Sequence, residues 1–326
     1  MSNKQQALYP LLFEWENVAR PWGGTHLGSS ANGLPIGERW LLSTLPEHES
    51  VVKNGALKGK NLQQVIEAYP TELLGKKTQR YTLPLVKWID TRLPLSIQVH
   101  PDDIFAQKLG LSNGKSELWY ILDVVDNASV YAGFREALNA EVLRNCIDNG
   151  TISDQMVTYR AQVGDCYFVP AGLVHAIGGG IQLLEIQQPS DTTYRLYDWG
   201  RTDAQGNKRE LHLDFGVAAA HLALRATLNK VDPTLRDKQV LVNSSPLYLA
   251  RHILGTESPL IIESKNEFRT YLSTSATFRL TWYSGNNVSS MTVAPMEVVL
   301  IPACIETYTL MATEVAGTSV LEFTVC

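Results

Sequence analysis

Short segments in which apolar and polar residues alternate dominate this chain, and the most regular one spans residues 95–100. Three apolar residues alternate there with three polar ones, namely Leu95, Ile97 and Val99 with Ser96, Gln98 and His100. Successive side chains of a strand point to opposite faces. The pattern therefore predicts a strand whose second face carries a hydroxyl, an amide and an imidazole. Because that face lacks Lys and Glu, it indicates a polar pocket rather than open solvent. Pro101 ends the strand.

Similar strand patterns recur along most of the chain, with few helical ones between them. Strands are predicted within 50–53, 83–90, 114–122, 155–169 and 181–187, and in most of the chain after residue 240. Helices are predicted at 61–69, 102–110 and 136–149, with a helical or mixed connector at 210–225. Many short strands separated by turn signals are typical of a β-sandwich or barrel. The long stretches without helix argue against a doubly wound α/β fold.

Two distant segments share one pattern. Residues 164–171 and 296–303 each place a turn before an apolar strand that ends in Pro-Ala. Five residues after the proline, the first copy has His175 and the second has Thr307. We therefore expect two related β-barrels, of which the second lacks the histidine. The expected domains are 1–225, which carries the site, and 226–326.

Composition and charge exclude several classes of protein. The chain has 326 residues, a formal net charge of −5 and 19% charged residues, without a basic run, which argues against a nucleic-acid-binding surface. No apolar stretch approaches the roughly 20 residues of a membrane span. The polar N-terminal residues do not resemble a secretory signal. The four cysteines form no CxxC pair, so a cysteine-built zinc site is not expected, and scattered thiols favour a cytoplasmic location.

The candidate chemistry lies around two of the seven histidines. The run from Gly164 to His175 has the spacing Gly-x5-Pro-x-Gly-x2-His and resembles the second motif of the cupin superfamily. The first cupin motif normally has His-x-His followed by Glu. Here it reads Gln98-x-His100, and Glu117 is the nearest suitable acid.

This departure from the general pattern is characteristic of one cupin family. Five segments closely resemble the type I phosphomannose isomerases in their compact form, namely residues 98–103, 114–120, 170–177, 185–195 and 197–201. The resemblance implies a mainly β fold with two cupin-type barrels or jelly rolls in tandem and a few short helices. It also implies one Zn²⁺ per chain, held by Gln98, His100, Glu117 and His175. Such ligands leave room for water or a substrate oxygen, and cobalt or manganese could also bind them.

The implied reaction interconverts mannose 6-phosphate and fructose 6-phosphate through an enediol. By resemblance, Arg195 would stabilise the developing oxyanion. The candidates for proton transfer are Lys115, Glu185 and Asp191, among which the sequence does not choose. The phosphate contacts would be Ser96, Lys87 and Arg201.

Other interpretations of these residues remain open. Lys87 could be an edge-strand charge, Glu185 a partner of a metal ligand, and Arg201 a surface charge beside Asp198. At the level of function, the alternatives are a cupin that binds or senses a sugar phosphate without turnover, or an iron-dependent oxygenase. The expected partner is a small sugar phosphate, with no nucleic acid or membrane, and the chain is expected to be a monomer or weak homo-oligomer.

Overall fold

The structure is a computed structural model that describes residues 8–75, 83–202, 205–285 and 287–325. Its contacts group the chain into two compact units. The central unit comprises Asn17–Trp40 and Leu85–Val231, and the C-terminal unit comprises Met1–Glu16, Leu41–Pro84 and Asp232–Cys326. The expected division between residues 225 and 226 stays a prediction about domains. The contacts divide the chain near it, at residue 231, but they also place residues 41–84 with the C-terminal unit.

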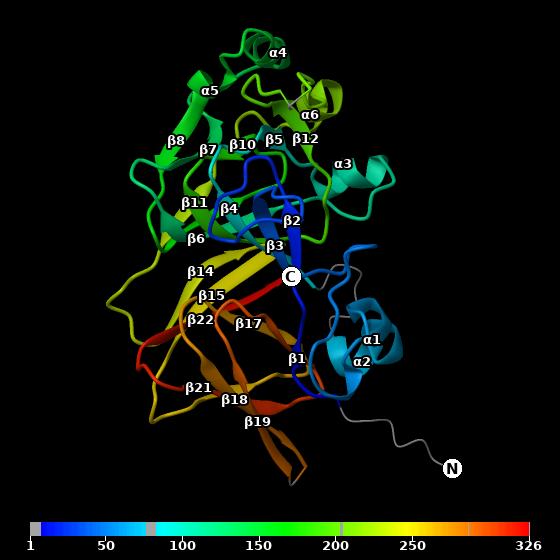
Figure 1. Ribbon diagram of the computed structural model, residues 1–326, viewed down its shortest axis with the longest axis vertical. Helices are drawn as coiled ribbons and strands as arrows, with labels where there is room; N and C mark the ends of the chain where they lie inside the picture. Colours follow the sequence, from blue (N-terminus) through cyan, green and yellow to red (C-terminus); the bar gives the residue numbers. More distant parts are fainter. Residues whose placement is uncertain (1–7, 76–82, 203–204, 286, 326) are drawn as a thin grey trace. The chain divides into compact units, whose positions relative to one another are not determined.

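Two antiparallel sheets build the central unit (Figure 1). The seven-stranded sheet has the order β13-β9-β6-β11-β4-β3-β2. Its strands are β2 (Glu16–Ala19), β3 (Ile36–Leu42), β4 (Leu85–Thr91), β6 (Glu117–Val124), β9 (Asp165–Val169), β11 (Ile181–Gln187) and β13 (Thr227–Lys230). The five-stranded sheet has the order β12-β5-β10-β7-β8. Its strands are β5 (Ile97–Val99), β7 (Ser129–Phe134), β8 (Met156–Arg160), β10 (His175–Ile177) and β12 (Tyr194–Tyr197).

The core of the central unit follows the alternation along these strands. One cluster includes Trp119, Tyr167 and Leu183 from the seven-stranded sheet. A second cluster includes Ile97 and Val99 of β5, and side chains of the helices α4 (Ala140–Asp148), α5 (Ile152–Gln155) and α6 (Leu213–Ala219). In Figure 1, α6 lies beside β12 and β5, and α4 lies beside α6. The apolar face predicted for residues 97–99 therefore packs against helices, and the opposite face is left for polar side chains.

The helices begin where short polar side chains cap them. Asp102 caps α3 (Asp103–Lys108), because its Oδ1 accepts a hydrogen bond of 2.7 Å from the N–H of Phe105. Asn139 caps α4 in the same way, so this helix begins later than the predicted 136–149. In the C-terminal unit, Asn61 and Gln64 form a capping box at the start of α1 (Leu62–Ala68). α2 (Pro70–Leu74), with proline in its first turn, was not predicted.

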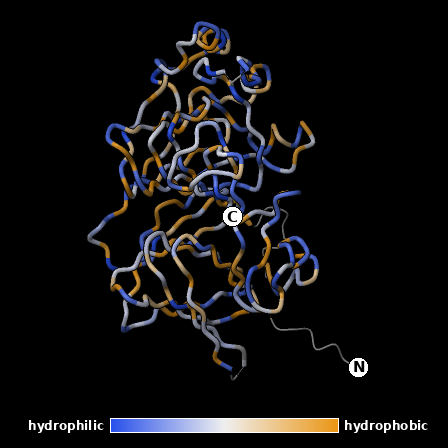
Figure 2. The backbone as a smooth tube through the Cα atoms, viewed as in Figure 1, coloured by the Kyte–Doolittle hydropathy of each residue, from blue (hydrophilic) through white to orange (hydrophobic). Residues whose placement is uncertain are grey.

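The C-terminal unit is also mainly β, as expected. Its six-stranded sheet has the order β1-β20-β17-β22-β15-β14. These strands are β1 (Leu11–Leu12), β14 (Lys238–Ser244), β15 (Leu247–Leu254), β17 (Arg269–Ser273), β20 (Val299–Ile301) and β22 (Thr318–Val325). The four-stranded sheet, β16-β21-β18-β19, consists of β16 (Leu260–Glu263), β18 (Phe278–Ser284), β19 (Asn287–Val293) and β21 (Thr307–Ala312). Hydrophobic positions recur along the strands of each unit (Figure 2).

Strand pairing shows that the two units repeat one arrangement. β6 pairs with β9 and β11, and β17 pairs in the same way with β20 and β22. Glu117 stands opposite Val169, and in the second copy Arg269 stands opposite Ile301. The tandem cupin-like architecture predicted from the sequence is thus confirmed, although the sheets are open rather than closed barrels. In the described part of the chain, no helix is long and apolar enough to cross a membrane.

Candidate metal centre

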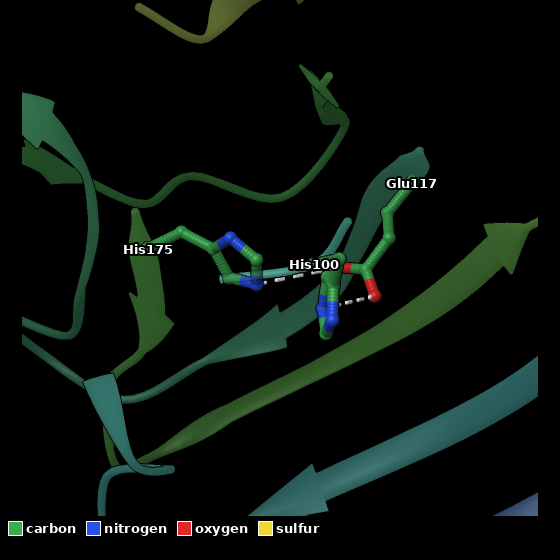
Figure 3. A group of neighbouring side chains, drawn as sticks. All are labelled: His100, Glu117 and His175. Atoms are coloured by element: carbon green, nitrogen blue, oxygen red, sulfur yellow. Dashed lines mark ion pairs between the residues drawn. The ribbon is translucent and has the colours of Figure 1, made fainter. Parts of the chain in front are cut away.

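Three strands of the central unit bring the candidate ligands together (Figure 3). Glu117 is the first residue of β6, His175 is the first residue of β10, and His100 directly follows β5. β5 lies between β10 and β12, so Gln98 is opposite His175 on one side and Arg195 on the other. Ligand atoms of His100, Glu117 and His175 lie within 4.8 Å of one another, and these three residues are buried.

The carboxylate of Glu117 lies between the two imidazoles. Its Oε1 is 3.0 Å from Nε2 of His100, and its Oε2 is 3.7 Å from Nε2 of His175. The ammonium of Lys115 is 2.9 Å from the same Oε1. Lys115 lies two residues before β6, and this ion pair brings its positive charge to the carboxylate.

The contacts of Nδ1 in each histidine determine the protonation of Nε2, the nitrogen that faces the carboxylate. Nδ1 of His100 lies 2.9 Å from the carbonyl oxygen of Thr192, and Nδ1 of His175 lies 2.8 Å from that of Leu173. A carbonyl only accepts, so each Nδ1 carries the proton and donates, and each Nε2 presents a lone pair. The two Nε2 lone pairs thus converge on Glu117. This is the arrangement in which neutral histidines bind metals.

The electrostatics of the cluster support the same assignment. Burial, and then the charge of Lys115, lower the pKa of His100 to about 3, although Glu117 acts in the opposite direction. Burial also lowers the pKa of His175. For Glu117, burial would raise the pKa, but the charge of Lys115 holds it well below its usual range. At neutral pH the site therefore combines two neutral imidazoles with one carboxylate.

Glu117 also tests whether these residues fit a metal ion. Its Oε1 is buried and accepts no hydrogen bond of good geometry from the described residues. It faces the unprotonated Nε2 of His100 at 3.0 Å, so two acceptors point at each other. A cation relieves such an arrangement, and Lys115 does so only from one side. The donor set of two nitrogens and a carboxylate fits a divalent metal.

Gln98 reaches the cluster with the other end of its amide. Its Nε2 lies 3.4 Å from Nε2 of His175, and its Oε1 accepts from the hydroxyl of Ser96 at 3.3 Å. Rotating the amide by half a turn would exchange its oxygen and nitrogen. Gln98 as a metal ligand therefore stays a prediction that requires this rotation.

Glu185 and Lys87 lie on the face of the seven-stranded sheet that carries Glu117. Glu185 of β11 stands opposite Lys87 of β4, and Gln187, two residues on, stands opposite Glu117. The Lys87 ammonium is 3.5 Å from Glu185 Oε1, and both residues are buried. Burial and the nearby Glu117 charge raise the pKa of Glu185 to about 7, against the lowering effect of Lys87 and Lys115.

The other residues assigned by resemblance have different environments. Arg195 is half-buried, and its Nη1 donates to the carbonyl oxygen of Glu210 at 2.7 Å. Asp191 is exposed, in the loop that also presents the Thr192 carbonyl to His100. Arg201 donates to the carbonyl of Pro94 and forms a close ion pair with Asp198. The structure thus brings Lys115 and Glu185 to the cluster, whereas Arg201 is engaged with protein groups.

The sequence did not single out several groups that organise this centre. The carbonyl groups of Thr192 and Leu173 orient the histidines, but backbone acceptors have no sequence signature. Glu38 is a buried carboxylate of β3, and Trp40 Nε1 donates to it at 2.8 Å. An acid two residues from a tryptophan within an apolar strand could have pointed to it, because both side chains then share a face.

Comparisons with known proteins agree with this architecture. The family model for the type I phosphomannose isomerase catalytic domain matches residues 12–122. A probable mannose-6-phosphate isomerase of Bacillus subtilis is 39% identical over 211 residues, or 63% of this chain and 66% of the relative. A mannose-6-phosphate isomerase of Streptococcus mutans is 38% identical over 212 residues, or 64% of this chain and 66% of the relative. These alignments span slightly less than two thirds of each relative.

Solved structures extend the similarity to nearly the whole chain. The mannose 6-phosphate isomerase of Bacillus subtilis superposes with a TM-score of 0.83 at 27% identity, covering 97% of this chain and 99% of that one. A putative mannosephosphate isomerase of Archaeoglobus fulgidus, at 19% identity and a TM-score of 0.72, covers 98% of this chain and 99% of that one and shares the fold.

Fold and site together define a cupin-like protein with a buried His–Glu–His cluster that could hold a metal ion. In its motifs and over the whole fold, the chain is similar to one family of that class, the type I phosphomannose isomerases.

Proposed function

We propose that this chain is a zinc-dependent aldose–ketose isomerase that interconverts mannose 6-phosphate and fructose 6-phosphate. The observation that carries this proposal is the pairing of two sites on one sheet face. The His–Glu–His cluster lies beside a second buried group, Glu185 with Lys87, on neighbouring strands. A metal-binding protein without turnover needs the first of these sites but has no use for the second.

His100, Glu117 and His175 would hold the metal, and Gln98 would join them after rotation of its amide. A bound Zn²⁺ would polarise the substrate oxygens at C1 and C2 as a Lewis acid. The identity of the metal belongs to the proposal, because these ligand types also suit other divalent ions.

Glu185 is the group best suited to move the proton between the two carbons. In the forward direction it would take the proton from C2 of the open-chain aldose, which leaves an enediolate with the negative charge on O1. Transfer of the O2 hydroxyl proton to O1 and return of the C2 proton to C1 would then give the ketose. A base works best when its pKa is near the working pH, and burial has raised that of Glu185 to about 7. Because of its exposure, Asp191 is a weaker candidate.

Lys115 would supply positive charge rather than accept a proton. Burial would lower its pKa, but the Glu117 and Glu185 charges outweigh this and raise it, so the ammonium stays protonated. A fixed cation can stabilise the developing enediolate oxygen, and Arg195 is a second cation proposed for that role. Both cations are in place before the substrate binds, so the charges around the oxygen need not rearrange during the reaction.

Binding of the phosphate by Ser96, Lys87 and Arg201 remains a proposal from the resemblance. A dianion would have to compete with the present partners of Arg201, which are Asp198 and the carbonyl group of Pro94. A cytoplasmic location is likewise proposed, since the free thiols of Cys146, Cys166 and Cys304 suit a reducing compartment.

A coupled assay tests the proposed function. The protein is stripped of metal with a chelator, reloaded with zinc, and supplied with mannose 6-phosphate while the formation of fructose 6-phosphate is followed. We expect turnover that disappears on chelation and returns with zinc. If the zinc-loaded protein binds mannose 6-phosphate without forming product, it is a sugar-phosphate-binding cupin and the proposal is wrong.

A further inference from the structure

A second buried carboxylate lies close to the proposed base and has so far no role. Glu38 is on β3, next to β4, and only 7% of its surface is exposed. Its Oε1 accepts from Nε of Arg20 at 2.9 Å, and its Oε2 accepts from Nη2 of Arg20 at 3.1 Å and from Nε1 of Trp40 at 2.8 Å. Two-point pairing with a guanidinium and a third donor fix the orientation of this carboxylate.

The same residues surround the ammonium of Lys87. It lies 4.7 Å from the centre of the Trp40 ring, a cation–π contact. Its closest described carboxylate is Glu185, at 3.5 Å, which is longer than a close ion pair. Glu38 shares the β3 face with Trp40, because the two residues are two apart. Burial would raise the pKa of Glu38, but the charges of Lys87 and Arg20 lower it to about 2.

Lys87 is therefore shared between two strands. On one side it faces Glu185 of β11, and on the other the Trp40 ring and the Glu38 charge of β3. Arg20, the remaining cation beside Glu38, is occupied in orienting that carboxylate. Beyond Lys87, the charged groups near Glu185 include the ion pair of Glu117, the first residue of β6, and Lys115, just before that strand.

We propose that Glu38 is a positioning residue for the isomerisation, which holds Lys87 back from Glu185 through charge and through the orientation of Trp40. This inference rests on the proposed function. With Glu38 present, the ammonium stays at a distance and leaves the Glu185 oxygens open to a substrate proton. Without its charge, Lys87 closes on Glu185 as a tight salt bridge and occupies the base.

Glu38→Gln tests the inference, because it keeps the shape of the side chain and removes its charge. In the zinc-loaded protein we expect kcat to fall about 10-fold or more, while KM changes by less than about twofold. A substitution that only loosened the fold would instead lower the melting temperature and the metal content. Both are measured beside the kinetics.

The role of Lys87 in this effect is tested by a double-mutant cycle. If Glu38 acts through Lys87, Glu38→Gln should have little further effect on kcat in a Lys87→Met background. Independent losses that multiply in the double variant would overturn the inference. Asp123→Asn is the matched control, because it makes the same charge change at an exposed position of β6 and should leave kcat unchanged.

Trp40→Phe provides a second route if Glu38→Gln does not fold. It keeps an aromatic ring near Lys87 and removes the N–H that Trp40 donates to Glu38. We expect kcat to fall about threefold, again with KM nearly unchanged. A kcat equal to that of the wild type would then contradict the inference. If the wild-type zinc-loaded protein itself shows no isomerisation, the proposed function fails instead, before any variant is compared.

Discussion

At the scale of single residues, the position of each proton decides what the site can do. His100 and His175 each donate Nδ1–H to a backbone carbonyl, so both Nε2 lone pairs converge on Glu117. This arrangement is complete before metal binds. Of the proposed ligands, only Gln98 would therefore have to reorient, by rotation of its amide.

Glu117→Gln should abolish tight zinc binding. The substitution removes the negative charge between two neutral imidazoles and leaves Lys115 without its closest ion-pair partner, which repels a cation. We expect the zinc content after dialysis to fall from about one per chain to near zero, and isomerisation to fall by about 10³-fold. Elemental analysis of the dialysed protein measures the first effect. Retention of zinc at the wild-type level would remove Glu117 from the ligand set.

Glu185→Gln should retain zinc but lose turnover, because an amide cannot accept the C2 proton. We expect kcat to fall by about 10²-fold or more. In the wild type, kcat should increase with pH as Glu185 loses its proton. The midpoint should lie at or below about 7, since a bound cation favours the carboxylate. A variant with full kcat would show that another group transfers the proton.

At the scale of elements, the two β units repeat the same strand pairing with different side chains at equivalent register positions. Arg269 occupies the position of Glu117, and Glu322 of β22 that of Glu185. Glu322 is buried and pairs with His252 at 2.7 Å and with Lys238 at 3.1 Å. The second unit thus fills its polar position with an ion-pair cluster instead of metal ligands.

Glu322→Gln should destabilise the protein by about 2–4 kcal/mol at pH 7, because it removes the buried negative charge that pairs with His252 and Lys238. Burial would raise the pKa of Glu322, but His252 and Lys238 lower it to about 2. A depressed folded-state pKa stabilises above the unfolded value of about 4.3, and this stabilisation is lost as the pH falls towards 2. Urea unfolding of the wild type and the Glu322→Gln variant at several pH values measures this difference in the free energy of unfolding. A difference that stayed constant from pH 7 to pH 3 would contradict the assignment.

At the scale of the whole molecule, zinc binding should be coupled to stability. Ligands from β6, β10 and the end of β5 are distant in sequence, so an unfolded chain does not hold them together. Zinc should therefore increase the melting temperature of the protein in a concentration-dependent way. His175→Ala should remove this response. Calorimetry of the two proteins with and without zinc tests it, and an equal response in the variant would place the ion elsewhere.

Local sequence signals were sufficient for much of the fold. The caps at Asn61 and Asp102 and the strand alternation at 95–100 depend on neighbours within a few residues, so they could be recognised without tertiary contacts. The cap at Asn139 was not recognised, and that helix was predicted to begin at residue 136. The repeated turn–strand–Pro-Ala pattern similarly predicted the two related units. α2 was missed because its helix signal is only one proline in a five-residue segment.

The residues of the candidate metal centre were predicted from the sequence alone, since the resemblance of their motifs to one family implied His100, Glu117 and His175 before any coordinates. What each side chain does there was decided by tertiary structure. The Thr192 carbonyl that orients His100, the amide end that Gln98 presents to His175 and the contact of Arg201 with the Pro94 carbonyl all arise between segments distant in sequence. Hydrogen-bond direction and burial are properties of such contacts. A pattern along the chain can therefore predict which groups meet, but not how they share protons and charge.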